Sequence, residues 1–179
     1  MSDDREERRA HLRRHLRLID DGVRPVMQRY PEQVQCGPGC SGCCHQTFRV
    51  SGPEGELLRE GLATLPEPRR AQILAKAQAY RPDERVPCPV LDEDGRCGLY
   101  EFRPRICRKY GIPLWHPDRP QEVRCCELNF RSMADIDADL ILEPQAKWAE
   151  RWIEFRRKHD AQRSPDRTIA EHLIQALGD

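Results

Sequence analysis

The chain has 179 residues, of which 34% are charged and 6% are aromatic, and its formal net charge is zero. This length predicts one domain with a small apolar core, so another source of order is needed. The zero net charge argues against nucleic acid or an anionic membrane as a partner. No stretch approaches the ~20 apolar residues of a membrane span, and the N-terminus lacks the apolar stretch of a secretory signal, which together predict a cytoplasmic protein.

The spacing of apolar residues predicts a mainly α fold with irregular cysteine-bearing loops and one short β-hairpin, that is, a small metal-stabilised domain. We expect Gly22 to end the first helix, Ser51 to cap the second one, and Ser164 to cap the last one with Pro165 in its first turn. The hairpin is predicted over residues 88–100, turning at Gly95. The helices are expected over residues 3–20, 53–64, 68–79, 144–159 and 165–177.

Three segments are predicted along the chain. Residues 1–30 form an N-terminal helix, and residues 31–131 form the cysteine-cluster core. Residues 132–179 form a C-terminal helical segment that packs on that core. In this last segment Trp148, Trp152 and Phe155 recur on one helix face, which is typical of a core-facing stripe.

Nine cysteines supply the missing source of order. Thiols of cytosolic proteins stay reduced unless chemistry uses them, and an odd number fits poorly with a closed disulfide framework. Gly37, Gly39 and Gly42 give the first cysteine group the backbone freedom that lets several sulfurs converge. Thiolates this close together would repel one another without a cation. The sequence therefore predicts a metal site on cysteines that form three groups: Cys36, Cys40, Cys43 and Cys44; Cys88, Cys97 and Cys107; and Cys125 and Cys126.

Adjacent cysteines restrict the kind of site. Neighbouring side chains diverge along an extended backbone, so Cys43 and Cys44 are awkward ligands for a single metal atom. They suit two atoms of one cluster, or two separate sites, and Cys125 and Cys126 repeat the pattern. Eight thiolates would serve two four-thiolate sites or one polynuclear site, and the ninth would be spare.

Three familiar motifs fit this sequence less well. The spacing of Cys36, Cys40 and Cys43 matches radical S-adenosylmethionine enzymes, but Gly42 stands where those enzymes usually carry an aromatic residue, and no βα alternation follows. A redox CxxC at Cys40 and Cys43 would need a βαβ pattern around it. A zinc ribbon needs two CxxC knuckles, and the sequence has one.

Three stretches together resemble a known family: CGPGCSGCCHQTFRVSGPEGE, CPVLDEDGRCGLYEFRPRICRKYG and CCELNFR. Over residues 34–131 the chain is similar to the YkgJ-type cysteine-cluster family of zinc- or iron-chelating proteins, which are related to flagellin N-methylase. Cys125 would be the spare thiol, because Arg131 follows Cys126 as the family pattern requires. Three residues rather than two separate the first two cysteines, which leaves the role of Cys36 open. The resemblance implies eight metal ligands: Cys36, Cys40, Cys43, Cys44, Cys88, Cys97, Cys107 and Cys126.

A thiolate–metal centre is anionic, so cations are expected beside it. Arg103 and Arg108 lie near Cys107 in the family-like segment, and we predict that they contact the cofactor. Thiolates suit both iron–sulfur clusters and zinc, and the doubled cysteines favour an iron–sulfur or other polynuclear iron centre. His45 and His116 are candidate extra ligands, although such histidines are more often simply exposed. Metal binding is expected to add directly to stability.

The expected function is therefore that of an iron–sulfur protein with a redox or protein- or peptide-modifying role. Such a protein would be an oxidoreductase or a peptide-modifying enzyme, with a protein or peptide as its substrate. The alternative is a zinc-binding interaction module, or a metal carrier, without catalysis. No Ser-His-Asp arrangement, phosphate loop or dinucleotide fingerprint accompanies the cysteines, so no catalytic residue is predicted.

Overall fold

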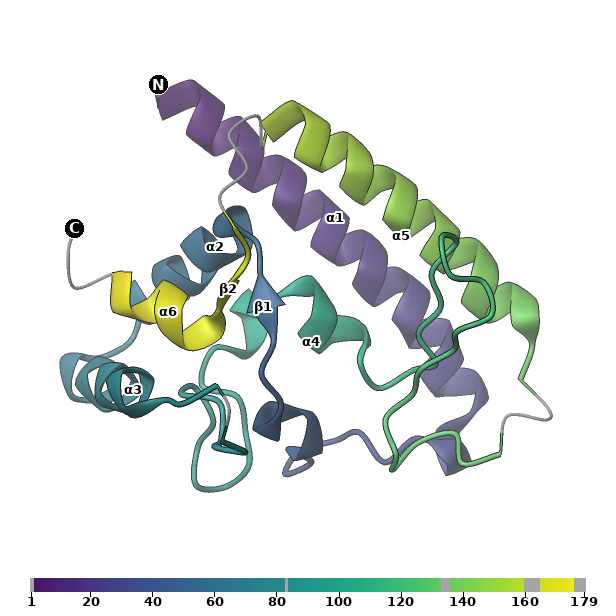
Figure 1. The fold of residues 1–179 in the computed structure, drawn as a ribbon, viewed down its shortest axis with the longest axis horizontal. Helices are drawn as coiled ribbons and strands as arrows, with labels where there is room; N and C mark the ends of the chain where they lie inside the picture. The colour runs from purple at the N-terminus through teal and green to yellow at the C-terminus, as the bar shows by residue number, and fades with distance from the viewer. Residues whose placement is uncertain (1, 83, 133–135, 160–164, 176–179) are drawn as a thin grey trace. The chain divides into compact units, whose positions relative to one another are not determined.

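The computed structural model describes residues 2–82, 84–132, 136–159 and 165–175. The protein is mainly helical, as predicted, with a short two-stranded sheet and irregular loops that carry the cysteines (Figure 1). None of the described helices is long and apolar enough to cross a membrane. The longer elements are α1 (Ser2–Arg29), β1 (Arg49–Val50), α2 (Gly52–Ala63), α3 (Glu67–Ala79), α4 (Arg105–Lys109), α5 (Ala138–His159), β2 (Arg167–Thr168) and α6 (Ile169–Ile174).

The chain folds into two compact units, and each unit combines two separate stretches of sequence. Unit 1 contains Met1–Cys36 and Arg105–Arg163, and unit 2 contains Gly37–Pro104 and Ser164–Asp179. Unit 1 therefore includes α1, α4 and α5, whereas unit 2 includes α2, α3, α6 and the sheet. The division into three segments along the chain stays a prediction.

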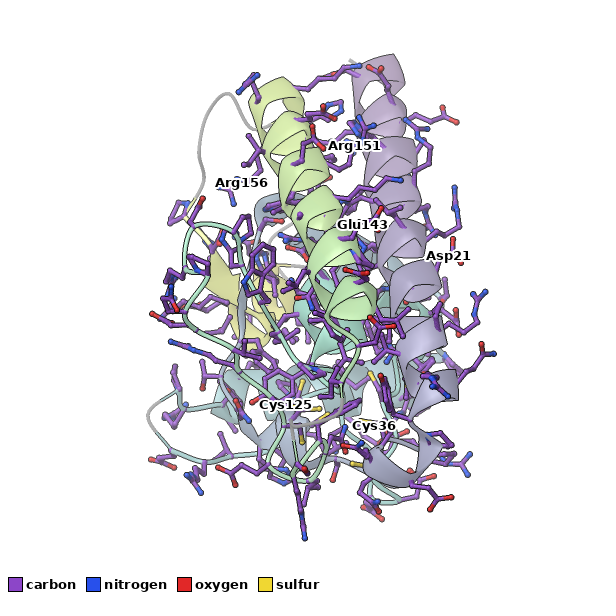
Figure 2. All side chains as sticks on the ribbon, turned by 90° about the vertical axis from the view of Figure 1, so that its right-hand side faces the viewer. Asp21, Cys36, Cys125, Glu143, Arg151 and Arg156 are labelled. Carbon is purple, nitrogen blue, oxygen red and sulfur yellow. The ribbon has the colours of Figure 1, made fainter. Side chains whose placement is uncertain are left out.

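Helices α1 and α5 run side by side and form the core of unit 1 (Figures 1 and 2). On α1 the buried side chains recur at alternating steps of four and three residues, which is the spacing of a helix–helix seam. From α5, Trp148 and Phe155 are buried in the same unit, as the aromatic stripe predicts. The buried residues of the α1 seam are Leu12, Leu16, Ile19, Val23 and Val26.

The first helix does not end at Gly22, contrary to the prediction. It continues to Arg29, because Val23 and Val26 extend its buried seam. At Gly22 the absence of a side chain makes room for a neighbour: a Cβ there would lie 2.6 Å from Cζ2 of Trp148. This glycine therefore permits a close helix–helix approach and is not a stop signal.

Helix α5 begins at Ala138, earlier than the predicted start at residue 144, and Pro144 lies within it. The loop between α4 and α5 is anchored to this helix by Gln145, which is 3% exposed. Gln145 Nε2 donates to Pro113 O over 2.7 Å, and Gln145 Oε1 accepts from Trp115 N over 2.9 Å. The anchored loop carries the cysteine pair of unit 1.

In unit 2, α2 and α3 begin within a residue or so of their predicted positions. Ser51 caps α2 as predicted, and its N–H and hydroxyl both donate to the carboxylate of Glu54, over 3.0 and 2.7 Å. On α3 Ile73 and Ala77 share one face of the helix and are buried, and Leu74 beside them is half-buried. Local capping and apolar spacing are sufficient to specify these two helices.

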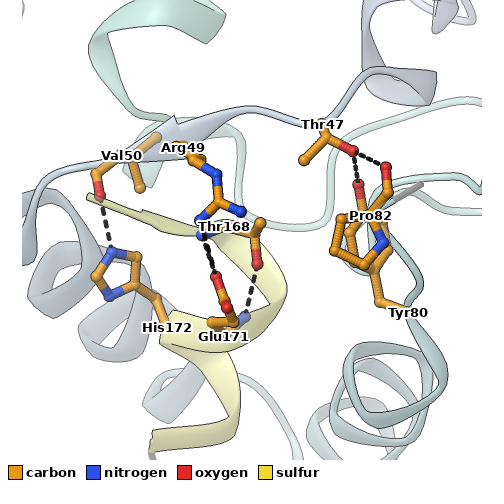
Figure 3. Close-up of polar contacts among 8 residues, drawn as sticks. All are labelled: Thr47, Arg49, Val50, Tyr80, Pro82, Thr168, Glu171 and His172. Carbon is orange, nitrogen blue, oxygen red and sulfur yellow. Dashed lines mark hydrogen bonds and ion pairs between the residues drawn. The ribbon is translucent and has the colours of Figure 1, made fainter. Parts of the chain in front are cut away.

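The last helix starts later than predicted. Ser164 lies outside the described residues, and Pro165 precedes β2 and is not helical. Thr168 caps α6, since Glu171 N donates to Thr168 Oγ1 over 3.1 Å and Thr168 N donates to Glu171 Oε2 over 2.7 Å (Figure 3). The strand pairing of β2 with β1 places this cap where the chain leaves the sheet.

Strands β1 and β2 form the antiparallel sheet, in which Arg49 pairs with Thr168 and Val50 with Arg167. The predicted hairpin over residues 88–100 is reduced to a single antiparallel bridge between Leu91 and Cys97. Its backbone turns at Gly95, as predicted, but the ladder does not extend beyond that bridge in the described residues.

Candidate metal centre

The first cysteine loop of unit 2 folds into a 3₁₀ turn at Gly42–His45. Cys44 N donates to Ser41 O over 2.8 Å, and His45 Nδ1 lies 3.1 Å from the same oxygen. Because the backbone turns here, the two adjacent side chains do not diverge: the thiol of Cys44 donates a hydrogen bond to the sulfur of Cys43. The expected divergence is wrong for this pair, and the two sulfurs can serve one metal atom or two neighbouring atoms.

The second cysteine loop, residues 88–98, is joined to the first by backbone contacts. Cys88 N donates to Cys44 O over 2.7 Å. Gly95 has a φ of +74°, and a Cβ there would lie 2.8 Å from the carbonyl oxygen of Gly39, which itself has a φ of +89°. Glycine is the residue that best tolerates both the left-handed backbone and the close approach. These two glycines therefore allow the two cysteine loops to approach each other closely.

Four thiols from the two loops influence one another electrostatically, and we call Cys43, Cys44, Cys88 and Cys97 the unit 2 thiol set. The hydrogen bond from Cys44 lowers the pKa of Cys43 to about 6, with smaller help from Arg103. The same bond raises the pKa of Cys44, which donates it. Burial raises the pKa of Cys88 to about 12 and also raises that of Cys97, and negative charge on Cys43 adds to both. The lowered pKa makes Cys43 the thiol of this set that ionises most readily, whereas the raised pKa values of Cys44, Cys88 and Cys97 favour their protonated forms in the absence of a bound cation.

Cys40 is the remaining cysteine of unit 2 and begins the first loop. Its N–H donates to Gly37 O over 3.0 Å, and its side chain is half-buried. No contact described for Cys40 joins it to the unit 2 thiol set. Its role as a ligand stays a prediction.

The two predicted cofactor-binding arginines have different surroundings. Arg103 belongs to unit 2, where its guanidinium lies 3.5 Å from the ring centroid of Tyr100, and its positive charge lowers the pKa of both Cys43 and Cys97. Arg108 lies on α4 of unit 1 and pairs with Asp20 of α1 at 2.5 Å. Arg103 is therefore placed to offset the charge of thiolates, whereas the ion pair of Arg108 joins two helices.

Unit 1 carries the other four cysteines, which are Cys36, Cys107, Cys125 and Cys126. Cys36 is exposed, and Cys107 lies half-buried on α4. Figure 2 labels Cys36 and Cys125, which lie towards the end of the helix pair where α1 finishes. Cys125 packs against the apolar core of the unit. Burial raises the pKa of Cys125 to about 11, and negative charge on Cys126 and Cys36 contributes.

Asn129 contacts three of these cysteines, although no motif in the sequence marks it. Its Nδ2 donates to Cys36 Sγ over 3.1 Å, and its backbone N–H donates to Cys126 O over 2.9 Å. The thiol of Cys125 points to Asn129 O, 3.7 Å away. Asparagine at this place forms no recognisable spacing with the cysteines, so only the folded chain reveals its position.

The donor chemistry of both units fits a thiophilic metal such as iron or zinc. In the described part of the chain, no three Cys, His, Asp or Glu side chains are arranged so that they could hold a metal ion as they stand. Ligation would thus need rotation and deprotonation of the thiols. His116 is exposed in unit 1, where it accepts a hydrogen bond from Asp118 N.

Residues 35–127 match the model of the CxxCxxCC family, whose description reads "Putative zinc- or iron-chelating domain". The match covers just over half of the chain and includes every cysteine of unit 2. No curated protein and no solved structure matches the chain.

Proposed function

The chain belongs to the CxxCxxCC family and is a metal-binding protein, and on this premise we propose that unit 2 carries an iron–sulfur centre with a redox role. The observation that carries the proposal is the unit 2 thiol set. Its four thiols come from two loops that are joined by the hydrogen bond from Cys88 N to Cys44 O and that approach closely at Gly39 and Gly95. Four cysteine thiolates are the usual ligand set of both [2Fe–2S] and [4Fe–4S] clusters.

The residues of unit 2 would have distinct roles in holding such a centre. Cys43 has the lowered pKa, so it is the thiol most ready to bind first at neutral pH. Cys44, Cys88 and Cys97 would lose their protons on binding, which makes metal affinity increase with pH. Arg103 supplies positive charge beside the set and would raise the reduction potential of the bound cluster.

The number of cysteine ligands limits the chemistry that a metal centre in unit 2 could perform. A centre held by four cysteines has no position open to substrate, so it suits electron transfer or structural support. When bound, an iron–sulfur cluster would accept and donate single electrons. Modification of a protein or peptide substrate would need a metal position that no cysteine fills, which the unit 2 thiol set does not offer.

A zinc site is the second candidate, and the closed four-thiolate set favours it specifically. Structural zinc is bound tetrahedrally by four cysteines in many small interaction modules. On this alternative, unit 2 would be stabilised by zinc and would act as a docking module without redox chemistry.

Anaerobic purification followed by iron, zinc and acid-labile sulfide analysis tests the proposal. We expect iron and sulfide together with a broad visible absorption that dithionite bleaches. Cys43→Ser and Cys88→Ser should remove the cluster of unit 2, whereas Cys125→Ser serves as the control and should retain it. Zinc without sulfide would replace the iron–sulfur proposal with the zinc module. Full metal content in the Cys43 and Cys88 variants would show that the unit 2 thiol set is not the site.

A further inference from the structure

We propose that one face of α3 positions the two cysteine loops of unit 2 before any metal enters, with Lys76 holding the second loop and Tyr80 holding the first through Thr47. The inference rests on the proposed function, because it names the residues that position the unit 2 thiol set. It goes further in assigning the geometry of the site to side chains that are not ligands. A metal would then bind to loops whose backbone is already in place.

The positioning face runs along the whole of α3. Arg69, Ile73, Lys76 and Tyr80 are separated by four, three and four positions, which places them on one side of the helix and its C-terminal cap. Ile73 is fully buried, and α3 packs against α6, so this face has a fixed seat in unit 2. Each of the three polar residues of the face reaches a segment that carries or adjoins a cysteine loop.

Lys76 holds the second cysteine loop by a charged hydrogen bond. Its Nζ donates to Leu91 O over 3.0 Å, and Leu91 forms the antiparallel bridge with Cys97. Leu91 N in turn donates to Cys88 O over 2.9 Å, so this one residue contacts the backbone of both cysteines of the loop. Hydrogen bonds from a charged donor are among the stronger ones in proteins. Lys76 therefore fixes the residue on which the spacing of Cys88 and Cys97 depends.

An ion pair holds the same loop at the next residue. Arg69 of α3 pairs with Asp92, and both side chains are half-buried. A Cβ at Gly98 would lie 3.3 Å from Arg69 Nη2 and 3.4 Å from Asp92 Oδ1, so the pair lies against the backbone directly after Cys97. Because α3 contacts the loop at Leu91 and again at Asp92, it fixes the direction of the loop as well as its position.

Tyr80 holds the chain that follows the first cysteine loop (Figure 3). Thr47 Oγ1 lies 2.8 Å from Tyr80 OH and 2.8 Å from Pro82 O. A threonine hydroxyl has a single proton, which Thr47 donates to the carbonyl oxygen, so the Tyr80 hydroxyl donates to Thr47. Thr47 comes two residues after the 3₁₀ turn at Gly42–His45. The end of α3 thus anchors the first loop through two directional hydrogen bonds.

These contacts matter for binding because they use no cysteine side chain. They form whether or not the thiols are bound, and the hydrogen bond from Cys88 N to Cys44 O joins the two positioned loops over 2.7 Å. When metal enters, the thiols have only to rotate and release their protons. A site whose binding-competent conformation is populated in advance binds more tightly, because the ligand does not have to order it.

Zn²⁺ alone, titrated into the metal-free full chain in competition with a chromophoric chelator, tests the positioning. The zinc class that Cys88→Ser removes identifies the unit 2 site. We expect Lys76→Met and Thr47→Val each to weaken this class by about tenfold, and the double variant by about 100-fold, since the two residues hold different loops. Lys76→Arg keeps the charged donor and Thr47→Ser keeps the hydroxyl, so both should retain most of the affinity.

Arg59→Met is the matched control. Arg59 of α2 is also a long cationic side chain of unit 2, but its Nη1 donates to His172 O over 3.2 Å and to Gln175 Oε1 over 3.0 Å, at the end of α6. This variant should lower the stability of unit 2 and leave its zinc affinity unchanged. Equal losses of affinity in Lys76→Met, Thr47→Val and the control would reflect stability alone and refute the positioning. Unchanged affinity in Lys76→Met and Thr47→Val would also refute it, while the metal site of unit 2 stands.

Amide hydrogen exchange in the metal-free chain gives a second readout, which needs no metal. We expect the amides of Cys44 and Gly98 to be protected, since their hydrogen bonds to backbone carbonyls measure 2.8 and 2.7 Å. Thr47→Val should speed exchange at Cys44, Lys76→Met should speed it at Gly98, and the control variant should change neither. Unprotected loop amides in the metal-free wild type would overturn the proposal even if zinc binds. Protected amides in a chain that binds no zinc would support the positioning and refute the proposed function.

Discussion

Acidification should destabilise unit 1 through a single buried histidine of α1. His15 is 3% exposed, and in the described part of the chain neither of its ring nitrogens has a hydrogen-bond partner. Its ring lies against Trp152 of α5, 5.4 Å between centroids. Burial, helped by the charges of Arg105 and Lys109 on α4 and of His11 on α1, lowers the pKa of His15 from 6.5 to about 3.

The sign of the effect follows from proton uptake on unfolding. Because the pKa of His15 is lowered in the folded chain, only the unfolded chain binds a proton at His15 between about pH 6.5 and pH 3. The free energy of unfolding therefore falls as the pH falls through this range. At 1.36 kcal/mol per pH unit, His15 should cost on the order of 3 kcal/mol between pH 7 and pH 4. Above pH 7 it should contribute no pH dependence.

His15→Phe removes the titrating ring and keeps an aromatic contact with Trp152. We expect the variant to be at least as stable at pH 7, because an unpaired buried ring nitrogen costs about 1–3 kcal/mol. Its loss of stability between pH 7 and pH 4 should be smaller than that of the wild type by about 3 kcal/mol. Denaturant unfolding followed by tryptophan fluorescence isolates this unit, since Trp115, Trp148 and Trp152 all belong to unit 1.

The control for this experiment is His116→Phe, which replaces an exposed histidine of the same unit and should keep the wild-type pH dependence. Acid also releases metal from thiolates, but that loss is common to all the proteins compared. A His15→Phe variant whose stability fell with pH as steeply as the wild type would refute the assignment.

Three other substitutions test contacts inside each unit. Gly22→Ala should lower the unfolding free energy of unit 1 by about 1–3 kcal/mol, because its Cβ collides with Trp148; an alanine that stabilised the helix would contradict this. Gly95→Ala should weaken metal binding by unit 2, because it disrupts the contact with Gly39, while the tryptophan-detected unfolding stays unchanged. Thr168→Ala should cost about 1 kcal/mol through the lost cap of α6, visible as faster amide hydrogen exchange in that helix.

The sequence specified those elements whose signals are local. Helix α2 starts where Ser51 and the following proline predict, and α3 follows the spacing of its buried residues. The errors came from residues whose role depends on a distant partner. From sequence alone Gly22 predicts a helix end, and only the fold shows that it makes room for Trp148. Thr168 caps α6 because the pairing of β2 with β1 ends the strand directly before this helix.

The cysteines show the same limit of prediction from sequence, because their surroundings depend on distant parts of the chain. The cysteine groups and the metal-binding family could be recognised from spacing, and the family match confirms that recognition. Sequence proximity nevertheless misleads about which thiols share a unit: Cys36 belongs to unit 1, whereas Cys40 and the pair that follows it belong to unit 2. The divergence expected for Cys43 and Cys44 failed because the glycine-rich loop forms a turn there. The ligand set remains a prediction that the serine variants test.

The discontinuous make-up of unit 2 sets an order of events during synthesis. Its cysteine loops are translated first, but β1 pairs with β2 and α2 packs against α6, and both partners are encoded far downstream of these loops. Domains generally fold as units as they emerge from the ribosome, and pairings between distant segments form late. The thiols of this unit therefore stay in an unfinished fold until β2 and α6 have been made. Metal loading of unit 2 should follow the synthesis of α6, and chains interrupted before β2 should carry reactive, unprotected cysteines.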